Sequence, residues 1–206
     1  MSASRLRLED LAALPRWPAA QVLALTGNCR GSLMQHWALH CTRRWGPGAV
    51  PLIRQDLGVA GSGLPDAPTL GEWVPAALQV RLVDIVLDRF LGDDWRTARE
   101  LFHADVERSG GRLLRAAVKA VGPSPFFHHA GKIHPHLYDV GVAAGAVDGK
   151  HATVTCSGAG LFLNPTWQAL QLLGFEVLLA LASRRPLDLY GETLPPDGFQ
   201  VTVEWA

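Results

Sequence analysis

The feature that most constrains the fold is a change in the spacing of apolar residues near residue 122. Upstream of it, apolar side chains recur every three or four positions, which is typical of helices with one buried face. At the C-terminus, apolar side chains instead occupy every second position, at Phe199, Val201, Val203 and Trp205. This alternation is typical of a strand that buries one face. The chain therefore combines a helical part with a sheet.

Helices are predicted throughout residues 1–122, because capping residues and glycine or proline breaks separate segments of helical period. The predicted helices are 32–45, 49–58, 76–91, 95–108 and 112–121. The strongest of these helices, 76–91, has a clear apolar face. We expect its polar residues Gln79, Asp84 and Asp88 to lie mostly outside that face.

Residues 123–206 are predicted to form a β-hairpin, a long apolar helix and a closing strand. The hairpin covers 137–157 and turns around Asp148 and Gly149. A two-residue loop and a three-residue loop would place different sets of side chains on the same face. We favour the three-residue loop, because it puts Val142 and Val154 together on one apolar face.

The order of elements predicts an α+β fold. An N-terminal helical half, residues 1–122, would pack with a C-terminal antiparallel sheet and with the long apolar helix at 166–183. We expect one domain with a continuous core over residues 1–206. An apolar pocket is expected between the 166–183 helix, the sheet and the helices of 76–108.

Charge and cysteine content exclude several classes of protein. The chain has 19 basic and 19 acidic residues, so it lacks the excess positive charge of a nucleic-acid-binding protein. Its three cysteines are too few and too scattered for a disulfide framework, which predicts reduced thiols and a cytoplasmic location. The most apolar window, 161–182, contains several polar residues and predicts a buried helix instead of a membrane span.

Known catalytic motifs are missing from the sequence. The glycine-rich segment 141–151 is one residue short of a phosphate loop and lies in the predicted hairpin. His36 and His40 have the spacing of a zinc-protease helix, but Trp37 replaces the catalytic glutamate, so the polar edge of a buried helix is preferred. These absences favour a binding protein over an enzyme.

A histidine-rich segment separates the two halves. It contains His128, His129, His134 and His136, and a proline between the last two predicts an extended backbone. A solvated linker is the preferred interpretation. The alternative is a transition-metal or haem site, with Asp139 orienting one imidazole.

Aromatic residues are the best candidates for a pocket wall, because large rings supply apolar surface for a small ligand. The candidate pocket residues are Trp95, Phe102, His103, Tyr138 and Trp167. Of these, His103 is also the alternative proximal ligand of a haem.

Four stretches of the sequence carry a family resemblance: CTRRWGPGAVPLIRQDLG, LPDAPTLGEWVPAALQVRLVDIVLDRFLGDD, LQLLGFEVLLALA and DGFQVTVEW. They resemble a paralogous family of uncharacterised myxobacterial proteins with a domain of unknown function. The layout is also similar to the haem-nitric-oxide-binding, vinyl-reductase and vesicle-tethering small-ligand fold. This second resemblance implies helices beside a sheet that encloses an apolar pocket. The chain lacks the Tyr-x-Ser-x-Arg motif that contacts haem propionates in the nitric-oxide sensors.

These observations predict a small-ligand-binding or sensory module in which the ligand alters the packing of helices on the sheet. One alternative is a metal- or haem-dependent protein that uses the histidine-rich segment. Another is a homodimeric interaction protein that pairs through the 166–183 helix.

Overall fold

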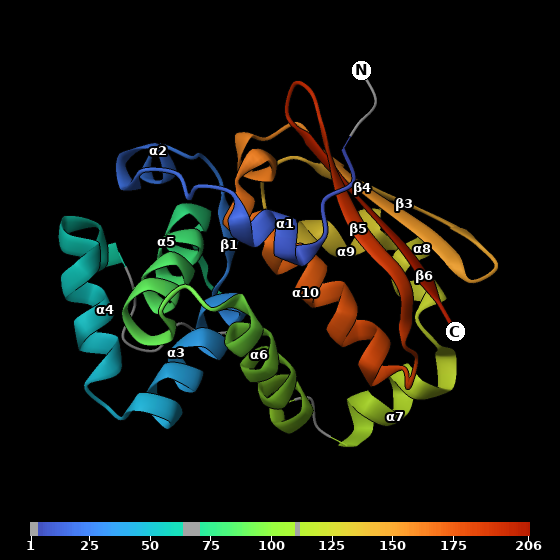
Figure 1. The fold of residues 1–206 in the computed structure, drawn as a ribbon, viewed down its shortest axis with the longest axis horizontal. Helices are drawn as coiled ribbons and strands as arrows, with labels where there is room; N and C mark the ends of the chain where they lie inside the picture. Colours follow the sequence, from blue (N-terminus) through green and yellow to red (C-terminus); the bar gives the residue numbers. More distant parts are fainter. Residues whose placement is uncertain (1–3, 64–70, 110–111) are drawn as a thin grey trace.

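The computed structural model describes residues 4–63, 71–109 and 112–206. Figure 1 shows an α+β fold in which helices precede a sheet, as predicted. The helices are α1 (Leu8–Ala13), α2 (Ala19–Leu23), α3 (Gly31–Trp45), α4 (Ala49–Leu57), α5 (Ala76–Val86), α6 (Trp95–Ser109), α7 (Arg112–Val121), α8 (Ser124–His128), α9 (Ala130–Ile133) and α10 (Pro165–Leu181). The strands are β1 (Asn28–Arg30), β2 (Trp73–Pro75), β3 (Val142–Asp148), β4 (His151–Ser157), β5 (Pro186–Leu194) and β6 (Gly198–Trp205).

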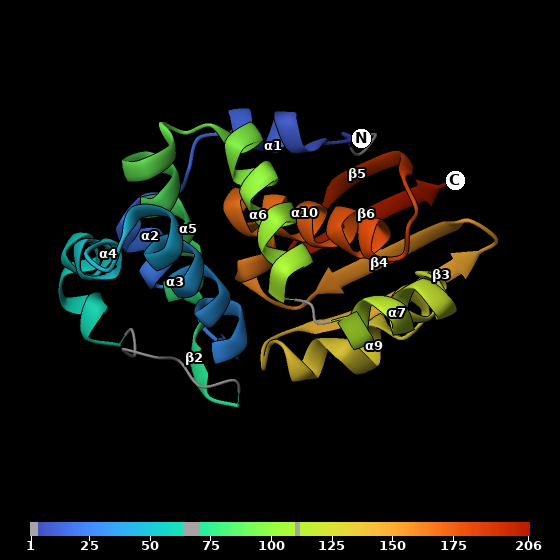
Figure 2. The same cartoon turned by 90° about the horizontal axis from the view of Figure 1, so that it is seen from below.

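The main sheet is antiparallel, with strand order β3-β4-β6-β5. Helix α10 packs against β5 and β6, and α8 packs against β3 and β4. The Phe127 ring of α8 joins these contacts, since its centroid lies 5.4 Å from that of Trp205 and 5.5 Å from that of Phe175. In Figures 1 and 2, α10 lies between the sheet and the helices α5 and α6. Helix α10 is thus the central element that both halves of the chain contact.

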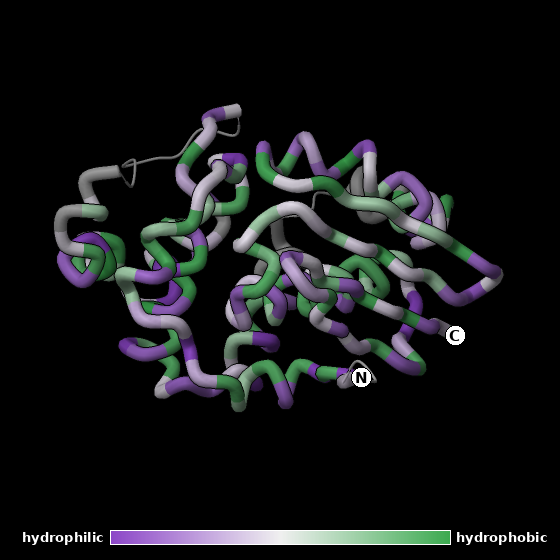
Figure 3. Tube along the Cα trace, turned by 90° about the horizontal axis from the view of Figure 1, so that it is seen from above, coloured by the Kyte–Doolittle hydropathy of each residue, from purple (hydrophilic) through white to green (hydrophobic). Residues whose placement is uncertain are grey.

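The register of the β3–β4 hairpin differs from the predicted one. Asp148 pairs with His151, so the loop has two residues, and its tip is hydrophilic in Figure 3. Val142 is consequently exposed on the outer face, and the face with Val154 faces the helices. The physical reason is the close approach of α8, because a Cβ at Gly145 would overlap the carbonyl oxygen of Phe127. The alanines and glycine of β3 form no strong apolar pattern, so the sequence did not show which face of this strand is buried.

Strand β5 was not predicted, and the histidine-rich segment is not extended. The nine residues of β5 occupy an edge of the sheet and show mixed burial, so their sequence lacks strict alternation. Residues around Pro135 form α9 and a 3₁₀ turn at His134–His136. Packing of this segment against β3 replaces the predicted linker with ordered structure.

The bounds of the strongest helices were predicted closely, but the burial of their polar residues was not. Helix α10 begins where Asn164 caps it, with the Asn164 Oδ1 atom accepting a hydrogen bond of 3.0 Å from the backbone N–H of Trp167. In α5, both Gln79 and Asp84 are buried, at 5% and 2% exposure, which corrects the expectation that they lie off the apolar face. Asp84 is buried because the Thr166 hydroxyl donates a 2.6 Å hydrogen bond to its Oδ1 atom.

Within the described ranges, no helix is both long enough and apolar enough to cross a membrane. Helix α10 is the most apolar helix, and its buried residues face the other elements of the same chain.

Candidate functional site

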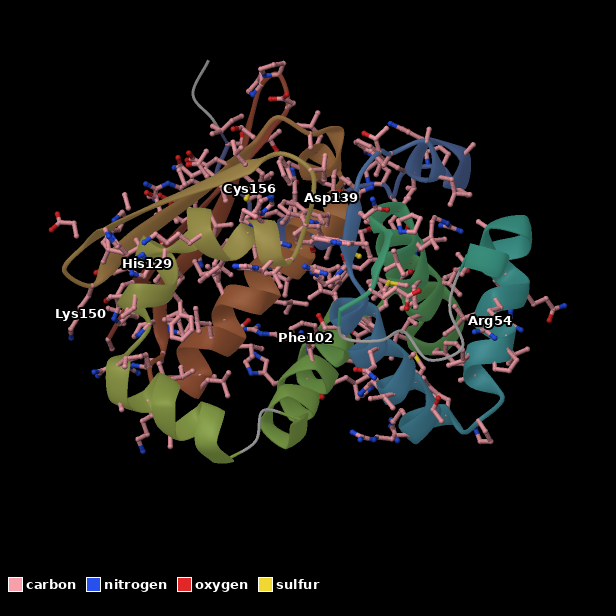
Figure 4. All side chains as sticks on the ribbon, turned by 180° about the vertical axis from the view of Figure 1, so that it is seen from behind. Arg54, Phe102, His129, Asp139, Lys150 and Cys156 are labelled. Carbon is pink, nitrogen blue, oxygen red and sulfur yellow. The ribbon has the colours of Figure 1, made fainter. Side chains whose placement is uncertain are left out.

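A cavity of about 220 Å³ lies between α3, α5, α6, α10 and the segment that precedes β3. Its wall is mainly apolar and aromatic. The lining residues are Leu33, Trp37, His40, Gln79, Leu101, Phe102, Leu137, Tyr138, Leu170, Gln171 and Gly174. Figure 4 shows Phe102 on the part of α6 that lies beside α3 and α10. The pocket therefore forms where the helical half meets the central helix.

The deep end of the pocket is polar. Tyr138 and Gln79 are only 5% exposed, and the Tyr138 hydroxyl donates a 3.1 Å hydrogen bond to the Gln79 Oε1 atom. Burial raises the pKa of Tyr138 well above its usual value, although interactions with Trp167, Gln79 and Gln171 oppose this rise. Tyr138 is therefore a neutral hydroxyl at physiological pH, and it orients the Gln79 amide.

The mouth of the pocket contains an exposed glycine within a helix. Among the described residues, no atom lies within 4 Å of a Cβ placed at Gly174, so none of these residues requires glycine there. A glycine inside a helix costs about 1 kcal/mol relative to alanine. The space above Gly174 belongs to the pocket, and a larger side chain would fill it. The aromatic side of the pocket includes Trp37 and Phe102, whose ring centroids lie 6.0 Å apart.

Charged groups tie α6 to α10 beside the pocket. The Arg99 Nε atom donates a 2.9 Å hydrogen bond to the Glu176 Oε1 atom, and the His103 Nε2 atom lies 3.3 Å from the same oxygen. Burial opposes ionisation of Glu176, but the hydrogen bonds from His103 and Arg99 outweigh it and lower the pKa of this carboxyl. Phe102 lies between Arg99 and His103 in α6, so the contacts to Glu176 and the pocket wall share one helical turn.

The structure places two of the five predicted pocket residues on the wall, Phe102 and Tyr138. Trp167 lies behind Tyr138, with ring centroids 6.1 Å apart, and its side chain is fully buried. His103 points to Glu176, and Trp95 packs against the core at the start of α6.

Several wall residues were not identified from the sequence. Gln79 and Gly174 had a detectable signal, because each is an unexpected residue type inside an apolar helical segment. Leu33 and Leu137 had none, since leucines at ordinary helical and loop positions are common everywhere.

The four histidines of the predicted metal site do not converge. His134 is buried, its Nε2 atom lies 2.9 Å from the Val140 carbonyl oxygen, and its ring stacks on Tyr138. His128 and His129 are exposed on α8 and at its end, as Figure 4 shows for His129. In the part of the chain with described coordinates, no group of three or more His, Cys, Asp or Glu side chains is placed to hold a metal ion.

Asp139, the predicted orienting residue, has another partner. Its Oδ2 atom accepts a 2.7 Å hydrogen bond from the Asn28 side chain, so this carboxylate holds the segment against β1. Figure 4 shows Asp139 far from His129.

All three cysteines are buried free thiols. Burial is the main cause that raises the pKa of Cys29, Cys41 and Cys156 to about 12. A thiol with this pKa is a poor nucleophile at neutral pH, so these residues serve as small apolar groups in the core.

Comparison with known proteins identifies the fold. No model of a known protein family and no curated protein matches the chain. Among solved structures, the Fe(II) unliganded H-NOX protein from K. algicida has a TM-score of 0.53 and 12% sequence identity, over 86% of this chain and 96% of that chain. An oxygen-binding H-NOX domain related to soluble guanylate cyclases has a TM-score of 0.54 and 9% identity, over 85% and 93%. A mutant of the T. Tengcongensis H-NOX protein has a TM-score of 0.56 and 10% identity, over 85% and 97%.

The chain is thus similar in fold to H-NOX proteins. This confirms the predicted α+β class and the resemblance to the haem-nitric-oxide-binding fold. The resemblance to the myxobacterial family finds no support in these comparisons.

The pocket does not fit a haem. A cavity of about 150 Å³ accommodates benzene, and the pocket of about 220 Å³ is only moderately larger, whereas a haem contains four linked pyrrole rings. The described residues that line the pocket include no arginine or lysine that would pair with the two propionates. His40 contributes the imidazole of the wall, and its Nε2 atom is buried. His103 is not one of the described residues that line the pocket, and its Nε2 atom lies 3.3 Å from the Glu176 Oε1 atom.

Proposed function

We propose that this protein is a sensory module that binds a small, largely apolar organic ligand in the pocket between α6 and α10. The observation that carries the proposal is the pocket itself, which combines an apolar aromatic wall with a few convergent polar groups at its deep end. The glycine at its mouth supports the proposal, because Gly174 keeps open a space that alanine would partly fill at a gain in helix stability. Fold likeness to an oxygen-binding H-NOX domain is in keeping with a binding role.

The contacts of Glu176 beside the pocket supply a means of transmitting the binding event. Phe102 lines the pocket, and its neighbours Arg99 and His103 bind Glu176 of α10. A ligand that separates the α6 and α10 walls must change these contacts. The proposed signal is this change in helix packing, which would alter the surface that α6 presents to a partner.

Thermal unfolding with a panel of small aromatic and aliphatic compounds tests the proposal. Because a ligand that binds the native state raises its stability, at least one compound should raise the Tm of the wild-type protein. Gly174→Leu should abolish this rise by filling the mouth. The matched control is Ala180→Leu, which adds a leucine to an exposed position of the same helix. A panel without any binder, or a Gly174→Leu variant that binds like the wild type, would overturn the proposal.

A further inference from the structure

The hydrogen bond at the deep end of the pocket has a defined donor and acceptor. The Tyr138 hydroxyl donates its proton to the Gln79 Oε1 atom, at 3.1 Å. This contact fixes the orientation of the Gln79 amide, so the oxygen faces Tyr138 and the nitrogen is left with two protons to donate. Within the described part of the chain, no hydrogen bond uses the Gln79 Nε2 atom. Gln79 nevertheless lines the cavity, so a bound molecule can reach its side chain.

A side-chain donor on the wall of a pocket selects for an acceptor. The Gln79 side chain is 5% exposed, and leaving its N–H groups without a partner in a filled pocket would cost free energy. An apolar ligand that displaced the solvent from the pocket would leave these groups unpaired. A ligand with a carbonyl oxygen at the same end would satisfy them.

The charge of the wall restricts the ligand further. Among the described residues, those that line the pocket include no Asp, Glu, Lys or Arg side chain. The acidic groups Glu176 and Asp84 of the surrounding helices already have partners, since Glu176 binds Arg99 and Asp84 binds Thr166 and Arg81. Apart from the His40 imidazole, the wall offers a charged ligand no group of opposite charge to replace its hydration, so the pocket favours a neutral molecule.

Size and shape complete the description. The cavity of about 220 Å³ exceeds the volume of about 150 Å³ that accommodates benzene, and it is smaller than most pockets for drug-sized ligands. Trp37, Phe102 and Tyr138 contribute ring surfaces to the wall, and such surfaces pack well against a flat molecule. The space therefore suits one ring with a short substituent, or a compact pair of rings.

Given the proposed sensory function, we infer that the ligand is a neutral, planar carbonyl compound of the size of an aromatic ketone, whose oxygen accepts a hydrogen bond from Gln79 Nε2. Its ring occupies the apolar part of the pocket between Phe102 and Leu170. The carbonyl end lies beside Tyr138, and the ring end points to the mouth at Gly174.

Three probes of nearly equal shape test this inference by isothermal titration calorimetry on the full chain. Acetophenone has the carbonyl oxygen, α-methylstyrene replaces that oxygen with a methylene group, and benzoate has a negative charge. Acetophenone should bind about tenfold more tightly than α-methylstyrene, because its oxygen can accept a hydrogen bond from Gln79 Nε2 and the methylene group of α-methylstyrene cannot. Benzoate should show no measurable binding.

A double variant assigns the preference to Gln79. In Gln79→Met with Tyr138→Phe, both partners of the internal hydrogen bond become apolar, which avoids leaving a buried hydroxyl unpaired. This variant should bind acetophenone and α-methylstyrene with equal affinity. Far-ultraviolet circular dichroism checks that it folds, and Tyr138→Phe alone, which retains the Gln79 donor, should keep the preference for acetophenone.

The outcomes separate the inference from the function on which it rests. Equal affinities in the wild type, tighter binding of the hydrocarbon or of benzoate, or a preference that survives in the double variant would each overturn the inference. The proposed function would stand in those cases if Gly174→Leu still blocked binding. If neither these probes nor the wider panel bound the wild type, both would fall.

Discussion

Helix α10 is held by two different kinds of contact, one to α5 and one to α6. On the α5 side, Asp84 is 2% exposed and accepts a hydrogen bond from Thr166 at the start of α10. On the α6 side, Arg99 and His103 bind Glu176, and the Arg99 side chain is 41% exposed. A buried polar contact is costly to break, whereas an ion pair with one solvent-exposed partner, such as Arg99 beside the 13% exposed Glu176, costs less to rearrange. The α5–α10 contact is therefore the fixed one, and the α6–α10 contact is the adjustable one.

This difference matters for the pocket because its walls come from both sides. Helix α5 supplies Gln79 at the deep end, and α6 supplies Leu101 and Phe102 near the mouth. The polar end of the pocket thus belongs to α5, which has the fixed contact to α10. The apolar end belongs to α6, which has the adjustable contact. A ligand would be oriented by Gln79 of α5 and would displace α6.

The largest expected effect comes from breaking the fixed contact. Asp84→Ala should lower the free energy of unfolding by about 3 kcal/mol, because it leaves the buried Thr166 hydroxyl and part of Arg81 without their partner. Urea unfolding followed by circular dichroism measures this loss. Asp88→Ala on the same side of the molecule, at an exposed position, is the control and should change stability by less than about 0.5 kcal/mol. Equal losses in the two variants would contradict the comparison.

Removal of the adjustable contact should cost less. Glu176→Gln keeps the shape of the side chain but removes its charge, and we expect a loss of about 1 kcal/mol because Arg99 is partly solvated. Urea unfolding at low and high salt is the measurement. If the contact is adjustable, the Tm rise produced by a bound ligand should survive in this variant. A loss of unfolding free energy as large as that of Asp84→Ala would show that both contacts are fixed.

A gain in stability is expected at the mouth of the pocket. Gly174→Ala should raise the free energy of unfolding by about 0.5–1 kcal/mol, because alanine is the better helix former and its Cβ atom meets none of the described side chains. Gly145→Ala is the contrasting variant, since its Cβ would overlap Phe127, and it should be destabilising. A destabilised Gly174→Ala would mean that the space above α10 is not open.

The smallest expected effect is a difference in pH dependence. Burial is the main cause that raises the pKa of Asp84, so its contribution to stability is present at low pH and declines as pH rises through the raised pKa. The pKa of Glu176 is lowered, because hydrogen bonds from His103 and Arg99 outweigh the effect of burial. Its contribution is therefore present above about pH 4 and declines as pH falls through the lowered pKa.

Unfolding experiments across the acidic range distinguish these two signs. The stability deficit of Glu176→Gln should vanish on acidification. Asp84→Asn, which resembles the protonated carboxyl, should improve relative to the wild type as the pH rises. Parallel pH profiles for the two variants would contradict the assignment of opposite shifts.

Much of the fold was predictable because local signals were strong. Asn164 and Pro165 mark the start of α10, and the glycine at position 92 ends the helical segment before α6. The strict alternation of residues 199–205 predicted β6. The β3–β4 register was wrong because it depends on the packing of Phe127 against Gly145, a contact between segments that no local pattern encodes.

The pocket was only partly predictable for a similar reason. Phe102 and Tyr138 were identified because large rings line most pockets, but Gln79 was assigned to the solvent side of its helix. Its burial requires Tyr138, which lies 59 positions further along the chain and supplies its hydrogen bond. A buried glutamine cannot be distinguished from an exposed one until its partner is known.

The sequence by itself determined where the chain forms helices and strands, because periodicity, caps and breaks act over a few residues. It also determined the low fraction of charged residues, which is 18% of the chain. Only the tertiary structure decided which face of each element is buried and which side chains meet at the pocket. The physical reason is that burial and hydrogen bonding of groups such as Gln79 and Asp84 depend on partners distant in the chain, and these partners come together only when α5, α6 and α10 pack.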